Sequence, residues 1–143
     1  CTSLPKTLIL PAHHACARPY LCAQLDLSDN FLGPEGAAVL APAIAVCVSL
    51  TSLSLGDNHL GDDGVEALSI GLKESKSLAM LDLSNRFSSS TAFGPKGAAA
   101  LASAIGVMAS LTKVSVSGNR LGKEGKAVLR KAVKGRSGFE LQL

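Results

Sequence analysis

The stretch LTSLSLGDNHL, residues 50–60, constrains the fold of this chain more than any other. Leu50, Leu53, Leu55 and Leu60 surround Asn58 in it. Apolar residues at every second position are typical of a strand, whereas a helix spaces them by three or four. The pattern therefore predicts a short strand that ends at once in an asparagine turn.

The same pattern recurs along the chain. Asn30 has the same place in CAQLDLSDNFL, 28 residues before Asn58, and Asn119 has it in LTKVSVSGNRL. The 61 residues from Asn58 to Asn119 are two periods plus five residues, which correspond to SSSTA inserted in a third copy that begins at Leu78. A glycine pair and an alanine-rich helical pattern follow each turn. Self-similarity at such a period indicates a solenoid.

The repeats divide the chain into units. We predict a degenerate N-terminal cap at 1–21, repeats at 22–49, 50–77, 78–110 and 111–138, and a final strand at 139–143. The alternative for 1–21 is the remnant of an earlier repeat, since Cys1 rather than Met begins the sequence and indicates a processed chain or a fragment. In the first repeat, Pro42 lies in mid-helix and predicts a kink or a split into two pieces.

The pattern LxxLxLxxNxLGxxG, followed by an AxxLAxAL-type helix, resembles the ribonuclease-inhibitor-like class of leucine-rich repeats, found in ribonuclease inhibitor, NOD-like receptors and the Ran GTPase-activating protein. The resemblance covers Leu21 to Leu143. It implies an α/β solenoid of about four repeats, with a parallel sheet on the concave face and helices on the convex face. Since this class mostly binds proteins, it also implies a non-catalytic protein-interaction module. Arg86 departs from the pattern at a turn-asparagine position, which predicts a remodelled lip there.

Composition and net charge limit the classes of partner that this chain is expected to bind. A net charge of +3 is too mild to indicate a nucleic-acid partner, and the longest apolar runs are shorter than a bilayer-spanning helix. We expect protein partners, among them subunits of a larger assembly. An intracellular location is favoured, either cytoplasmic or, if Cys1 reflects processing, organellar.

Three surfaces are candidates for a protein contact. The concave face is predicted to present small polar side chains that also suit a plain solvated surface: Gln24, Asp26, Ser28, Ser52, Ser54, Gly56, Met80, Asp82, Ser84, Lys113, Ser115 and Ser117. The inserted lip combines an aromatic ring, a cation and polar residues: Arg86, Phe87, Ser88, Ser89, Ser90, Thr91 and Phe93. Its alternative is a tolerated insertion in which Phe93 fills the leucine position of the turn. The convex helices are apolar where polar residues are expected, and we favour this surface for an assembly contact: Val39, Val46, Ala99 and Val107.

Catalytic and cofactor chemistry have little support in the sequence. We predict no cofactor, because the glycine pairs lack a following GK[ST]. His13, His14 and Cys16 lack a fourth metal ligand at a sensible spacing, and Cys16 could instead pair with Cys22 in an oxidising compartment.

Two further interpretations concern lysine and arginine side chains. Lys126, Arg130, Lys131, Lys134 and Arg136 in the last helix suit a polar terminal cap, with an anionic partner as the alternative. The second hypothesis for function is a GTPase-regulating protein, by analogy with the Ran activator. In that case an arginine at a strand-to-helix lip, Arg86 or Arg120, would supply charge to phosphoryl transfer.

Overall fold

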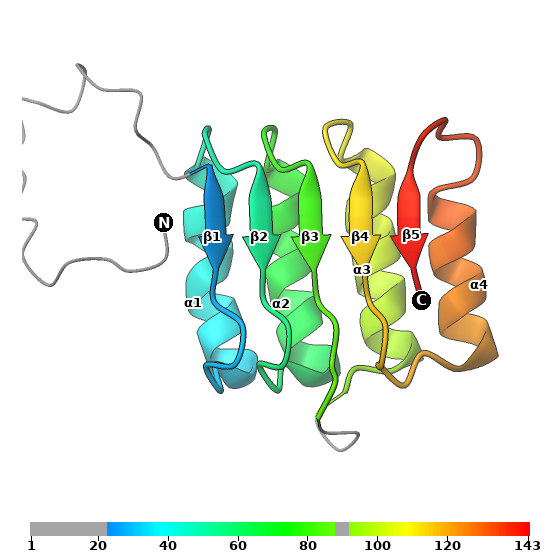
Figure 1. Ribbon diagram of the computed structural model, residues 1–143, viewed down its shortest axis with the longest axis horizontal. Coiled ribbons are helices and arrows are strands. Elements are labelled where there is room, and N and C mark those ends of the chain that lie inside the picture. The colour runs from blue at the N-terminus through cyan, green and yellow to red at the C-terminus, as the bar shows by residue number, and fades with distance from the viewer. Residues whose placement is uncertain (1–22, 88–91) are drawn as a thin grey trace, which may run out of the picture.

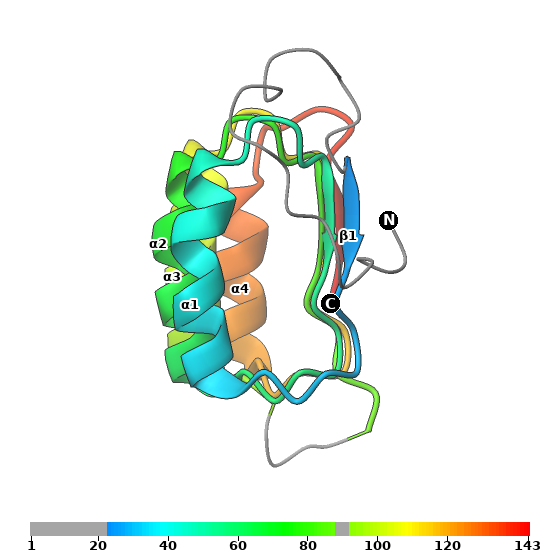
Figure 2. The same ribbon diagram turned by 90° about the vertical axis from the view of Figure 1, so that its left-hand side faces the viewer.

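The computed structural model describes residues 23–87 and 92–143, in which short strands alternate with helices. The elements are β1 (Gln24–Asp26), α1 (Gly33–Val46), β2 (Ser52–Ser54), α2 (Gly61–Glu74), β3 (Met80–Asp82), α3 (Pro95–Val107), β4 (Lys113–Ser115), α4 (Gly122–Ala132) and β5 (Glu140–Gln142). The strands form one parallel sheet in chain order (Figure 1). The helices form a second layer on one side of that sheet (Figure 2). The predicted α/β solenoid is confirmed, and β5 lies within the predicted final strand.

The strands pair in a register that stacks equivalent residues from each repeat. Leu25, Leu53, Leu81, Val114 and Leu141 lie opposite one another in turn. Since alternate strand residues point to opposite faces, this row points into the core. Its three inner members are buried, whereas Leu25 and Leu141 at the two ends of the row are partly buried.

The asparagine turns tie each repeat to its neighbour. Asn58 is buried, and its Nδ2 donates to the carbonyls of Leu27 at 2.7 Å and Gly56 at 3.2 Å. Its Oδ1 accepts from the backbone N–H of Asn30 at 3.0 Å. These bonds pair backbone groups that the sharp bend would otherwise bury unsatisfied. The turn asparagine therefore links adjacent repeats through hydrogen bonds to their backbones.

Of the two effects predicted for Pro42, a kink or a split of the first helix, the split is wrong. The helix α1 runs from Gly33 to Val46 with Pro42 inside it. A proline in mid-helix removes one N–H donor, but Ala37 and Ile44 of α1 are buried in the core. Tertiary packing therefore holds the helix across the missing hydrogen bond.

None of the helices in the described part of the chain combines the length and the hydrophobicity needed to cross a bilayer. The predicted N-terminal cap lies outside the described residues.

Candidate interaction surfaces

The outer side of α1 and α2 carries an apolar groove. It is lined by small residues and one large aliphatic residue, has a volume of about 320 Å³, and is called here the α1–α2 groove: Ala38, Ala41, Pro42, Ala45, Ala67, Ile70, Gly71 and Glu74. A second hollow of about 290 Å³ shares Ala45 and Glu74 with it and is also lined by Val46 and Val48. The two hollows therefore adjoin at Ala45 and Glu74, and the second also has Lys76 and Ser77 in its lining.

Large aliphatic side chains around these two hollows have high exposed fractions. The exposed fraction is 77% for Val46, 82% for Val48 and 68% for Ile70. Val39 on α1 is 77% exposed but lines neither hollow. A soluble chain that leaves several such side chains together in water commonly uses them in a contact.

The groove has a backbone floor because α1 and α2 approach closely at Gly71. A Cβ atom at Gly71 would lie 2.0 Å from the carbonyl oxygen of Ala41 and 2.6 Å from its carbon. Only glycine fits there, so the two helices meet without intervening side chains.

The other residues predicted on the helix layer lie on α3, beyond the groove. Ala99 is exposed there, and Val107 at the end of α3 is 64% exposed. Of the four predicted convex residues, Val46 therefore lines a hollow, whereas Val39, Ala99 and Val107 lie outside both hollows.

The predicted concave surface is a hydrogen-bonded polar row on the sheet. The pKa of Asp26 is lowered because the side-chain hydroxyl and the backbone N–H of Ser28 both donate to its carboxylate. Lys113 pairs with Glu140 at 2.9 Å, which lowers the pKa of that glutamate. A hollow of about 350 Å³ lies on this face, between Ser52 and Gln142. Its lining includes the other predicted residues of the inner strands: Ser54, Met80 and Asp82.

The lip between β3 and α3 is held from the neighbouring repeat by Asp57. This carboxylate is buried, and it accepts hydrogen bonds from the backbone N–H of Arg86 and from Arg86 Nε at 3.0 Å. Burial raises the pKa of Asp57, but the bonds from the Arg86 backbone and guanidinium outweigh it and keep the pKa below its usual range. The guanidinium also lies 5.4 Å from the Phe87 ring centroid.

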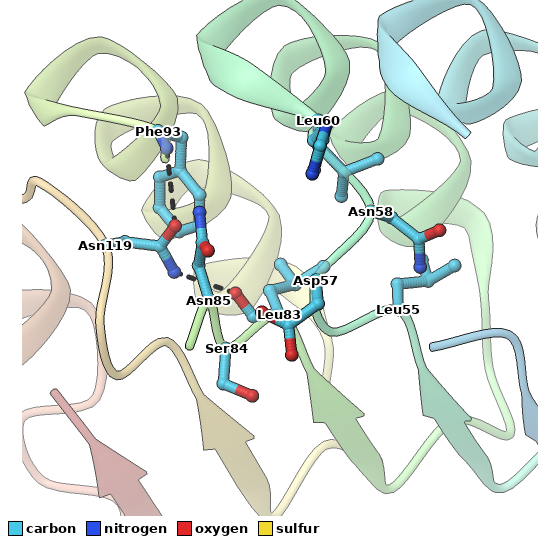
Figure 3. A pocket seen from close by; sticks show the side chains of 10 residues that line it. Leu55, Asp57, Asn58, Leu60, Leu83, Ser84, Asn85, Phe93 and Asn119 are labelled. Carbon is cyan, nitrogen blue, oxygen red and sulfur yellow. Dashed lines mark hydrogen bonds between the residues drawn. The ribbon is translucent and has the colours of Figure 1, made fainter. Parts of the chain in front are cut away.

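The lip is remodelled, as the displaced asparagine predicted. Asp57, beside Asn58 in Figure 3, holds the backbone of Arg86, which stands at the turn-asparagine position. Sequence reasoning missed this role of Asp57, although an acid directly before the turn asparagine was a visible signal.

Phe93 packs inward at the other end of the insertion. It is 2% exposed and fills the position that leucine has in the other repeats, so its ring is not available to a partner. Its backbone N–H donates to Asn119 Oδ1 at 3.3 Å, and Asn119 Nδ2 donates to the carbonyl of Leu83 at 2.7 Å (Figure 3). The predicted contact residues Ser88 and Thr91 lie outside the described residues.

Arg136 of the basic C-terminal region has a structural role. Its guanidinium donates to the carbonyls of Ile105 at 2.9 Å, Met108 at 2.8 Å and Leu111 at 2.6 Å. It therefore satisfies carbonyls where α3 ends, a contact with the preceding repeat that the cap interpretation did not include, and it lies beyond α4 rather than in the last helix. The ring of Phe139 lies against it, 4.7 Å from the guanidinium carbon to the ring centroid.

The residues considered above for a metal site or a disulfide lie outside the described residues. Among residues 23–87 and 92–143, no three or more His, Cys, Asp or Glu side chains lie together as a metal site requires. The Sγ of Cys47 lies 3.8 Å from Ser49 Oγ. His13, His14, Cys16 and Cys22 lie outside the described residues.

Comparison with known proteins agrees with this geometry. A family model described as "Leucine Rich repeat" matches residues 24–41, 46–69 and 107–126. The matched segments are leucine-rich repeats, and the fold is that of a leucine-rich repeat solenoid. No curated protein matched its sequence.

Two solved structures share the fold. The tropomodulin C-terminal domain from Caenorhabditis elegans superposes with a TM-score of 0.69 at 17% identity, covering 84% of this chain and 72% of that chain. A structure described as "Leiomodin-1 Actin-Binding Site 2" gives a TM-score of 0.69 at 18% identity, covering 84% of this chain and 69% of that chain. At these identities the likeness is one of fold.

Proposed function

We propose that this leucine-rich repeat solenoid is a non-catalytic protein-interaction module, and that it joins a larger assembly through the α1–α2 groove. The observation that carries the proposal is the set of exposed aliphatic side chains, Val46, Val48 and Ile70, around two adjoining hollows. Exposing such side chains to water is unfavourable, so a partner that covers them gains free energy.

The groove suits an apolar helix from the partner. Its floor is formed by alanines and by the close approach of Gly71 to Ala41, so a helix can approach the backbone. Helices bind such grooves through apolar side chains spaced by three or four residues. Glu74, shared by both hollows, offers a carboxylate that would orient a donor on that helix.

The free energy gained by burying one side chain sets the loss of affinity that a variant should show. Burying a Val or Ile side chain contributes about 1.5–3 kcal/mol. Because about 1.4 kcal/mol corresponds to a tenfold change in affinity, replacing one by a charged residue is expected to weaken the complex by roughly tenfold or more.

The experiment is affinity capture with quantitative mass spectrometry, using the wild type, Val46→Glu and Ile70→Glu. The matched control is Ala127→Glu, which adds the same charge at an exposed position of α4. We expect both groove variants to lose the same stoichiometric partner while the control retains it. If both groove variants fold normally and retain every partner, the groove is not the contact.

Actin is the first purified partner to test, because the leiomodin-1 structure that shares this fold is an actin-binding site. Co-sedimentation with filamentous actin, using the same variants and control, provides this arm. Co-sedimentation of the wild type that Ile70→Glu abolishes would identify actin as the partner of the groove.

The alternative, a GTPase-regulating activity, depends on an available arginine at the lip. Arg86 supports it poorly because Asp57 already binds its guanidinium. Arg120 is exposed at the equivalent lip of the fourth repeat. A GTPase assay with Arg86→Ala and Arg120→Ala distinguishes the two functions, since a loss of rate acceleration in either variant would favour the alternative.

A further inference from the structure

Two of the four phenylalanines in this chain lie on the surface. Phe93 and Phe139 pack against the core, whereas Phe31 and Phe87 are each 76% exposed. In a chain with 3% aromatic residues, exposed rings at scattered positions would need no explanation, but these two share one position of the repeat.

That position directly follows the turn-asparagine position, at the lip where the chain passes from strand to helix. It holds Phe31, His59, Phe87 and Arg120 in the four repeats. Because the repeats stack in register, this sequence position becomes a row along one edge of the solenoid. The row is aromatic and cationic.

The first members of the row are held in place. The rings of Phe31 and His59 meet edge to face, with centroids 4.8 Å apart and planes at 78°. Both residues have a positive φ, 51° and 58°, which is costly for residues with bulky side chains. Phe87 follows Arg86, whose backbone Asp57 holds. We call Phe31, His59, Arg86 and Phe87 the lip cluster.

The electrostatic surroundings of the lip cluster are acidic. Asp57, 3.0 Å from Arg86, raises the pKa of this arginine most, and Asp29 and Asp82 raise that pKa further. Neither Asp29 nor Asp82 takes part in an ion pair among the described residues. Residues 23–110 carry nine Asp or Glu against four Lys or Arg, whereas residues 111–143 carry two against eight. The lip cluster therefore lies in the negative part of the molecule.

We propose that the lip cluster binds an extended segment of a partner protein that carries arginine or lysine side chains. A cation would lie over the exposed face of Phe31 or Phe87 while Asp29 supplies the opposite charge. The chain already makes one such contact, since Arg86 lies 5.4 Å from the centroid of the Phe87 ring. This site uses none of the residues of the α1–α2 groove and does not depend on it.

The test measures fluorescence anisotropy of a labelled peptide of about nine arginines at low ionic strength, where charge attraction is least screened. Phe31→Leu and Phe87→Leu keep an apolar side chain but remove the ring quadrupole, and Asp29→Asn keeps a residue that tolerates the positive φ of 57° at that position. The matched control is Val107→Leu, a change between exposed aliphatic residues on α3. Glutamate and serine peptides of the same length provide the charge controls.

We expect the arginine peptide to bind and the glutamate peptide not to bind. Each Phe→Leu change should weaken binding about two- to five-fold, the range for an exposed cation–π contact, and Val107→Leu should have no effect. Asp29→Asn should weaken binding and reduce its dependence on salt.

Four results would contradict the proposal. The first is no binding of the arginine peptide, and the second is tighter binding of the glutamate peptide. The third is binding that only Asp29→Asn weakens, which would reduce the site to general charge attraction. The alternative occupant is a second copy of this chain, whose α4 is basic. It is excluded if sedimentation shows that the wild type and Phe87→Leu are both monomers. The fourth result is self-association that Phe87→Leu disrupts, which would contradict the proposed partner.

Discussion

Replacing Gly71 by alanine tests the close approach of α1 and α2. The new Cβ atom would lie 2.0 Å from the carbonyl oxygen of Ala41 and 2.8 Å from its Cα. Ordinary contact begins at 3.4 Å, so the two helices would have to separate by roughly 1.4 Å, an overpacking that typically costs about 1–3 kcal/mol. The atoms that clash belong to the backbone, so no side chain can rotate to relieve the overlap.

A helix-propensity gain opposes this cost. Alanine in a helix is favoured over glycine by about 1 kcal/mol. Taking an overpacking cost at the upper end of its range, we expect Gly71→Ala to lower the free energy of unfolding by about 2 kcal/mol and the melting temperature by about 6 °C.

Gly106→Ala is the matched control for this prediction. Gly106 also lies in a helix, α3, but a Cβ atom there would meet nothing within 4 Å. This variant should therefore be stabilised by about 0.5–1 kcal/mol through propensity alone. Urea unfolding followed by circular dichroism measures both variants. If Gly71→Ala proves as stable as Gly106→Ala, the close helix approach, and with it the backbone floor of the groove, is refuted.

Two further predictions concern the turns. Asn58→Ala should lower the free energy of unfolding by about 3 kcal/mol, because it leaves buried backbone groups unpaired. Asn30→Ala at the exposed first turn should lower it by about 1 kcal/mol. Equal losses for the two variants in urea unfolding would contradict this prediction. Because the folded pKa of Asp57 lies below 3.8, its bond to Arg86 stabilises the fold above about pH 4, and this stability is lost as the pH falls through the folded pKa. Asp57→Asn should therefore destabilise the protein at about pH 7 by about 2 kcal/mol and flatten the acid side of its stability profile; an unchanged profile would argue against the lip geometry.

Much of the fold was readable from the sequence because the repeat imposes it. Leu53 and Leu81 face the core since period-two alternation and register leave no other choice, and Asn58 has the bonds that a sharp buried turn requires. The confirmed features are those that each repeat specifies locally.

The features that the sequence did not reveal are contacts between repeats. From the sequence alone, Gly71 is a residue that weakens its helix. The structure shows that the carbonyl of Ala41 leaves no room for a side chain there. Asp57 contacts Arg86, 29 residues away in the chain, and Arg136 binds carbonyls at the end of α3 in the preceding repeat. Pro42 was expected to kink or split α1, and α1 is not split, because the sequence shows the lost hydrogen bond but not the packing that compensates for it.

Hydrogen exchange measured by mass spectrometry on a complex with a captured partner tests the central claim most directly. If the α1–α2 groove is the contact, amide exchange should slow in residues 33–46 and 61–74 when the partner binds, and Ile70→Glu should remove this protection. Protection confined to the strands β1 to β4, with α1 and α2 unchanged, would contradict the proposed contact and place the partner on the sheet face.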